Sequence, residues 1–232
     1  MKFKYLFIVL FFGFFPNISF SQTKKQISLS FQPVFGNAPL QLNEKYYKLS
    51  SGDSLLIETL KFYISGIELL HKGKSVCKEA KSFHLADASI EKSLTVFLKT
   101  KPGIIFDAVK FNLGIDSATN VSGALGGDLD PTKGMYWAWQ SGYINFKLEG
   151  KSNLCKTRNN EFHFHLGGYL SPFYALKTTT LQAQGKEKIN IKIDIAAFIS
   201  NTALAKENQI MSPSKEAVLL SEKAINTFTV KP

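Results

Sequence analysis

Apolar and polar residues alternate along many separate stretches of this chain, and no other feature limits the fold as strongly. In the clearest stretch, the isoleucines at every second position from Ile189 to Ile195 are separated by Asn190, Lys192 and Asp194. Side chains two positions apart point to the same face of a β-strand, so such a stretch can bury one face and expose the other. The same alternation occurs at 27–31, 60–64, 67–69, 94–98, 106–113 and 144–148.

Turn-forming residues separate these stretches, for example Lys101, Pro102 and Gly103. Many short strands joined by turns are typical of antiparallel sheets. The sequence therefore predicts an all-β protein, an antiparallel β-sandwich with a Greek-key-like strand order. One short helix is expected near the C-terminus, over 217–226, because Ser212-Pro213 forms a helix-start signal before it.

The N-terminus has the pattern of a secretory signal peptide. Lys2 and Lys4 precede an apolar run over 5–15, and Ser19 and Ser21 supply the small residues of a cleavage site. We expect residues 1–21 to be removed and 22–232 to form a single exported domain, in the periplasm or outside the cell. The apolar run is shorter than the 20 or so residues of an ordinary transmembrane helix, so no membrane span is expected in the mature chain.

Charge and cysteine content add two expectations. The formal net charge is +10 at pH 7, but the lysines are scattered along the chain, so nucleic acid is not an expected partner. Cys77 and Cys155 are the two cysteines. In an oxidising compartment an even pair is first interpreted as a disulfide, so a Cys77–Cys155 bond is predicted.

Two of the four histidines lie close together in the stretch 161–166. On a strand, His163 and His165 share one face, while Phe162, Phe164 and Leu166 face the core. Two imidazoles at this spacing, about 6.5–7 Å apart at the backbone, can reach one zinc or copper ion. A solvated polar face is the alternative interpretation. Two histidines are too few for a closed metal site, so further ligands, with His71 and His84 as candidates, would have to come from elsewhere.

The stretch 134–143 holds both tryptophans, Trp137 and Trp139, and ends in Tyr143. These rings can be core packing, or they can form an exposed aromatic surface that contacts a partner. No nucleophile elbow, zincin motif or phosphate-binding loop accompanies them, so an enzyme is not expected.

A long loop over 114–134 precedes the aromatic stretch and contains Asp116, Asp128 and Asp130. Loops of this length are often functional. Carboxylate oxygens are the ligands that calcium prefers, so a calcium site is one interpretation of these residues. Aspartates that stabilise turns are the other.

Several of these motifs together resemble the MbnP-like family of exported copper-binding proteins. The similarity rests on the motif 135–143, the Gly-Ile-Asp loop with Asn120, the Phe-Tyr-Ile-Ser strand at 62–65 and the His-Leu-Gly sequence that starts at His165. The resemblance runs over roughly 27–170. It implies that His165 is a copper ligand. It also implies a di-haem peroxidase-like partner, which in some members oxidises a tryptophan.

One family motif is missing, because Asn120 is followed by Val121 where the family often has histidine. His163 would have to replace that ligand. The leading hypothesis is therefore a non-enzymatic, exported, copper-binding protein that uses His163 and His165. The alternative is a metal-free β-sandwich module for adhesion or partner binding.

Overall fold

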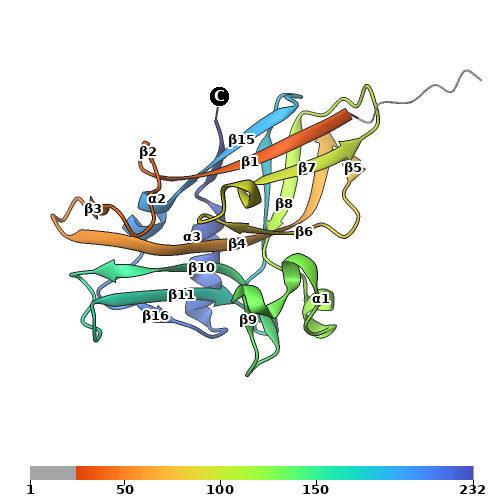
Figure 1. Ribbon diagram of the computed structural model, residues 1–232. Coiled ribbons are helices and arrows are strands. Elements are labelled where there is room, and N and C mark those ends of the chain that lie inside the picture. Colours follow the sequence, from red (N-terminus) through yellow and green to blue (C-terminus); the bar gives the residue numbers. More distant parts are fainter. Residues whose placement is uncertain (1–24, 232) are drawn as a thin grey trace, which may run out of the picture.

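The computed structural model describes residues 25–231, so the predicted signal peptide lies outside the described residues. Strands dominate the fold and form two packed sheets. In the view of Figure 1, β1 and β15 of one sheet lie above β4 of the other sheet, and β10 and β11 continue that second sheet below β4. This arrangement confirms the predicted β-sandwich. In residues 25–231, no helix is long and apolar enough to cross a membrane.

The smaller sheet is built around β1, which lies between β15 and β7. Its strands are β1 (Lys25–Phe35), β2 (Ala38–Pro39), β7 (Thr95–Thr100), β15 (Lys188–Asp194) and β17 (Phe228–Val230). The β1–β15 pair is parallel, unlike most pairs in the fold. Parallel neighbours need a long connection, and here the chain between them includes nearly all of the larger sheet.

The larger sheet is built around β4 (Ser54–His71), which pairs with β3, β5, β6, β8 and β10. Two predicted stretches, 60–64 and 67–69, belong to this one strand, and the left-handed Gly66 (φ +59°) lies between them. The remaining strands are β3 (Tyr46–Lys48), β5 (Lys74–Lys78), β6 (Phe83–Asp87), β8 (Ala108–Leu113), β9 (Tyr136–Trp137), β10 (Gly142–Ser152), β11 (Glu161–Gly167), β14 (Lys177–Gln182) and β16 (Gln209–Ile210).

Aromatic side chains fill the space between the two sheets. Phe31 of β1 contacts Phe62 of β4 and Phe111 of β8 edge-to-face, each with ring centroids 5.9 Å apart. Phe228 of β17 contacts the same three rings. The alternation in the sequence places these phenylalanines on inward faces, where their burial is the main favourable contribution to folding.

Short helices and a small hairpin complete the fold. Ser214 caps the C-terminal helix α3 (Lys215–Ile225) through its side chain, which accepts a hydrogen bond from Ala217 N. α3 packs on β11 and β14, so the predicted C-terminal helix is confirmed. The other elements are α1 (Ser117–Val121), α2 (Ile195–Ser200), the 3₁₀ turns η1 (Glu91–Leu94), η2 (Gly127–Leu129) and η3 (Pro131–Lys133), and the hairpin β12 (Tyr169–Leu170) and β13 (Phe173–Tyr174).

The predicted Cys77–Cys155 disulfide is wrong, because both thiols are free. Cys77 pairs with Leu69 near the C-terminal end of β4, whereas Cys155 follows Ser152, which pairs with Leu55 near its N-terminal end. Those two ends of β4 lie roughly 40 Å apart along the extended strand. A disulfide needs Cα atoms within about 7 Å of each other.

Candidate functional site

Strand β11 places His163 and His165 on the same face, as the alternation predicts. Phe162, Phe164 and Leu166 on the opposite face are completely buried in the core. The two imidazole rings lie with their centroids 6.2 Å apart, nearly perpendicular to each other. The two histidines are therefore neighbours in space, on the side of the larger sheet that faces away from the sandwich core.

His165 is buried, with 7% of its surface exposed, although the alternation suggested an exposed position. Its Nε2 lies 2.6 Å from Oε1 of Glu149 on the neighbouring strand β10. Glu149 is directly opposite His163 in the pairing of β10 and β11, so it reaches His165 diagonally. His163 is half-buried, and its Nδ1 lies 3.2 Å from Oε1 of Gln209.

Glu149 carries a strong electrostatic preference for its ionised form. Burial opposes ionisation of this carboxylate. The hydrogen bond with His165, the positive charge of Lys147 and a hydrogen bond with Thr59 outweigh that effect, and they lower the pKa of Glu149 to about 2. Glu149 therefore holds the Nε2 side of the His165 ring, which leaves Nδ1 as the ring atom not engaged by the carboxylate.

The 6.2 Å between the two ring centroids lies near the upper end of what joint binding of one ion allows. Imidazole nitrogens bind such a metal at about 2.0–2.1 Å, which places two ring centroids about 5 Å apart at a tetrahedral ion and about 6.4 Å apart at a linear one. A ligating histidine usually donates its other ring N–H to a carboxylate or carbonyl, which is the arrangement between His165 and Glu149. Within residues 25–231, however, no group of three or more histidine, cysteine or acidic side chains could hold a metal ion.

The other two histidines do not join this pair. His84 of β6 forms a 2.7 Å contact with Glu79. Strands β4 and β10 separate β6 from β11, so the backbone of His84 lies at least about 14 Å from that of the pair. His71 is at the far end of β4, where its Nδ1 is 3.4 Å from Asp107.

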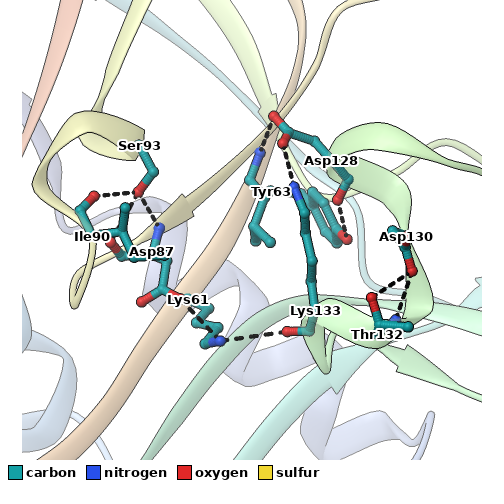
Figure 2. Close-up of polar contacts among 10 residues, drawn as sticks. Lys61, Tyr63, Asp87, Ile90, Ser93, Asp128, Asp130, Thr132 and Lys133 are labelled. Atoms are coloured by element: carbon teal, nitrogen blue, oxygen red, sulfur yellow. Dashed lines mark hydrogen bonds and ion pairs between the residues drawn. The ribbon is translucent and has the colours of Figure 1, made fainter.

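The three loop aspartates stabilise local structure. Asp116 caps α1 by accepting a hydrogen bond from Thr119 N, and Asp130 caps η3 by accepting one from Thr132 N. Figure 2 shows Asp128 between Tyr63 and Lys133: its backbone oxygen accepts from the Tyr63 hydroxyl, and its carboxylate from Lys133 Nζ at 2.7 Å. These contacts agree with the turn interpretation for Asp116 and Asp130, whereas the Asp128 carboxylate also accepts from Leu85 N and so ties the loop to β6.

The predicted aromatic surface is largely internal. Trp137 is 6% exposed and Tyr143 is 1% exposed, because β9 folds back on the start of β10. Trp137 packs on Gly167, where an added Cβ would lie 2.7 Å from its ring. Trp139, in the turn between β9 and β10, is 67% exposed. Only Trp139 of the three can therefore serve as a contact surface.

Several residues around the histidines went unnoticed in the sequence. Lys61 of β4 pairs with Asp87 at 2.9 Å and donates to the backbone oxygen of Lys133, which ties the loop to the sheet (Figure 2). Lys147 of β10 donates to the oxygen of Gly134 in the same way. The alternation in the sequence places Glu149 on the polar face of its strand. Its diagonal contact with His165, however, depends on how β10 and β11 pair.

Two comparisons with known proteins give matches. Residues 24–212 match the sequence profile of a family described as MbnP. Among solved structures, MbnP from Methylosinus trichosporium superimposes with a TM-score of 0.64 and 13% sequence identity, covering 84% of this chain and 87% of that chain. At this identity the superposition shows a shared fold. No curated protein matches the chain.

Proposed function

The chain belongs to the MbnP family, and we propose that it is an exported, non-enzymatic protein that binds a metal ion, with copper as the expected ion. His163 and His165 are the proposed ligands. Neutral imidazole is a good ligand for copper, which binds such sites more tightly than the other divalent first-row metals do. Bound there, the ion would be cargo or a resident cofactor held by the outer face of β11.

The observation that carries this proposal is the paired geometry of the two rings. Their centroids are 6.2 Å apart, and the carboxylate of Glu149 orients one of them. In metal sites such a carboxylate fixes the tautomer and the direction of the ligating ring, and its loss typically costs 10–100-fold in affinity. The family also supports copper, since the resemblance at His165-Leu166-Gly167 assigns a ligand role to this histidine.

Titration of the purified protein with copper tests this proposal. We expect His163→Ala and His165→Ala each to weaken copper binding by about tenfold or more, because each removes one of two ligands. His71→Ala is the matched control, since His71 lies at the far end of β4, and it should bind like the wild type. Binding should also weaken as pH falls through the imidazole range, because protons compete for the ligand nitrogens.

Equal copper affinity in the wild type and all three variants would contradict the proposal. The alternative would then be a metal-free partner-binding module. That role has one specific support, the 67% exposure of Trp139, which extends from a turn at the end of the sandwich. For either role the family resemblance suggests a di-haem peroxidase-like partner, and co-purification from the native host with and without Trp139→Ala tests that contact.

A further inference from the structure

A second site is suggested by a pocket that lies across β4 from His163 and His165 and is lined in part by His84. It has a volume of about 480 Å³ and lies between β6, η1, the start of β7 and the loop that carries η2 and η3. Small-molecule sites in proteins typically have volumes of about 300–1,000 Å³. Figure 2 shows its two sides, with Asp87, Ile90 and Ser93 facing Asp128, Thr132 and Lys133, and with Lys61 joining them.

One wall of the pocket is apolar. Leu85 of β6 and Val96 of β7 are part of this wall and are 7% and 5% exposed, so they form a firm surface. Ile90, before η1, is 44% exposed and also lines the pocket. An exposed isoleucine beside two buried aliphatic residues offers apolar area that a ligand can cover, and removing that area from water favours binding.

The acidic side chains in this pocket are already engaged. The Asp87 carboxylate accepts hydrogen bonds from both the backbone N–H and the hydroxyl of Ser89, and it pairs with Lys61. Asp128 accepts from Leu85 N and from Lys133 Nζ. The carboxylates are thus directed to protein groups, and they do not form a cation site.

The ammonium groups, in contrast, retain donors. Each lysine has three N–H donors. Lys133 uses one of them on Asp128, and Lys61 uses two, on Asp87 and on the oxygen of Lys133. Lys92 of η1 is exposed and pairs with no other group in residues 25–231. The lining holds three lysines and two aspartates, and its histidine, His84, contacts Glu79 at 2.7 Å. The lysines therefore exceed the aspartates by one, and the unpaired ammonium group is that of Lys92.

We propose that this pocket binds a small organic monoanion, a carboxylate attached to a compact apolar body. The apolar body would cover Ile90, Leu85 and Val96, and the carboxylate would accept hydrogen bonds from Lys92 and the other ammonium groups. Such charge-assisted hydrogen bonds are stronger than neutral ones, and they distinguish an acid from an amide of the same shape. The proposed site uses neither His163 nor His165, so it does not depend on the copper proposal.

Binding of three matched probes to the metal-free protein tests this inference. Benzoate is the anion, benzamide its neutral isostere and benzylamine its cationic counterpart, and amide chemical shifts in NMR titrations report both the affinity and the place of binding. We expect saturable benzoate binding that shifts the amides of Leu85, Val96 and Thr132, with benzamide and benzylamine at least about tenfold weaker. Hexanoate serves as a second, aliphatic acid.

Two variants locate the site. Lys92→Gln should weaken benzoate binding by about tenfold, whereas Lys99→Gln, on the exposed face of β7 and outside the pocket, should leave it unchanged. His165→Ala should also bind benzoate like the wild type, which separates this site from the copper site. The inference is overturned if neither acid binds saturably, if benzamide binds as tightly as benzoate, or if Lys92→Gln matches the wild type.

Discussion

At the scale of single residues, the contact between Glu149 and His165 distinguishes this sheet face from an ordinary solvated one. The carboxylate is 21% exposed and the imidazole 9% exposed at the side-chain level, and the two atoms in contact are 2.6 Å apart. At this depth a charge is stabilised only when it has partners. The lowered pKa of Glu149 shows that those partners, His165 first among them, outweigh the cost of burial.

This contact leads to a prediction about pH. The pKa of Glu149 is about 2 in the folded chain and about 4.5 when unperturbed. Because the folded value is the lower one, the carboxylate contributes stability above about pH 4.5, and that contribution is lost as pH falls towards 2. Glu149→Gln should therefore lower the free energy of unfolding by about 2–3 kcal/mol at pH 7 and by much less at pH 3.

Urea unfolding at a series of pH values measures this difference. Glu161→Gln is the control, because Glu161 lies on the same face of β11 and should change stability by no more than about 0.5 kcal/mol. A gap between Glu149→Gln and the wild type that stays constant from pH 7 to pH 3 would show that the ionised carboxylate is not the source of the stability.

At the scale of elements, the loop over 114–134 is attached to the sheet by two buried tyrosines. The Tyr63 hydroxyl donates to the oxygen of Asp128. The Tyr143 hydroxyl accepts from Leu125 N at 2.9 Å and donates to the oxygen of Leu129 at 3.1 Å. Burial raises the pKa of both tyrosines, so both hydroxyls keep their protons as donors. A loop without regular strands therefore has a defined path over the sheet.

Removing one of these hydroxyls should loosen the loop without unfolding the sandwich. We expect Tyr143→Phe to lower the free energy of unfolding by about 1–2 kcal/mol, since it leaves the Leu125 and Leu129 backbone groups without a partner. Hydrogen exchange should become faster in 114–134 but not in β4 or β10. Tyr136→Phe is the matched control, because the Tyr136 hydroxyl forms no hydrogen bond with the described part of the chain and its ring stays against Tyr143. Equal exchange in both variants would contradict this role.

Across the whole molecule, the long strand β4 holds the two cysteines far apart, because each lies near a different end of it. Its C-terminal end pairs with β5, which carries Cys77, and its N-terminal end pairs with the end of β10, just before Cys155. Cys155 is buried, and burial raises its pKa to about 11, so this thiol is unreactive in the folded state.

The separation of the two cysteines predicts the outcome of thiol labelling. In denaturant without reductant, intact mass should show two alkylated thiols per chain, the same as after reduction. In the folded protein, Cys77 should react much faster than Cys155, because it is the more exposed of the two. A mass increase that appears only after reduction would mean that the thiols are paired and would contradict the arrangement around β4.

The local part of this structure follows from the sequence alone. The alternation at 189–195 and 162–166 predicted which side chains face the core, because the direction of a side chain along a strand depends only on its position. For the same reason His163 and His165 were correctly placed on one face. The helix near the C-terminus followed from the helix-start signal and spacing before and within 217–226, and motif similarity pointed to the family.

Which strands lie side by side is a property of the tertiary fold, and the remaining features follow from that pairing. The parallel pairing of β1 with β15, the diagonal contact of Glu149 with His165, and the burial of Trp137 under the β9–β10 turn all join residues through strand pairing. The free cysteines have the same cause. An even number of cysteines in a sequence says nothing about the distance between them, which here is set by the roughly 40 Å between the two ends of β4. Strand pairing is a contact between segments distant in sequence, and a local pattern carries no information about its partner.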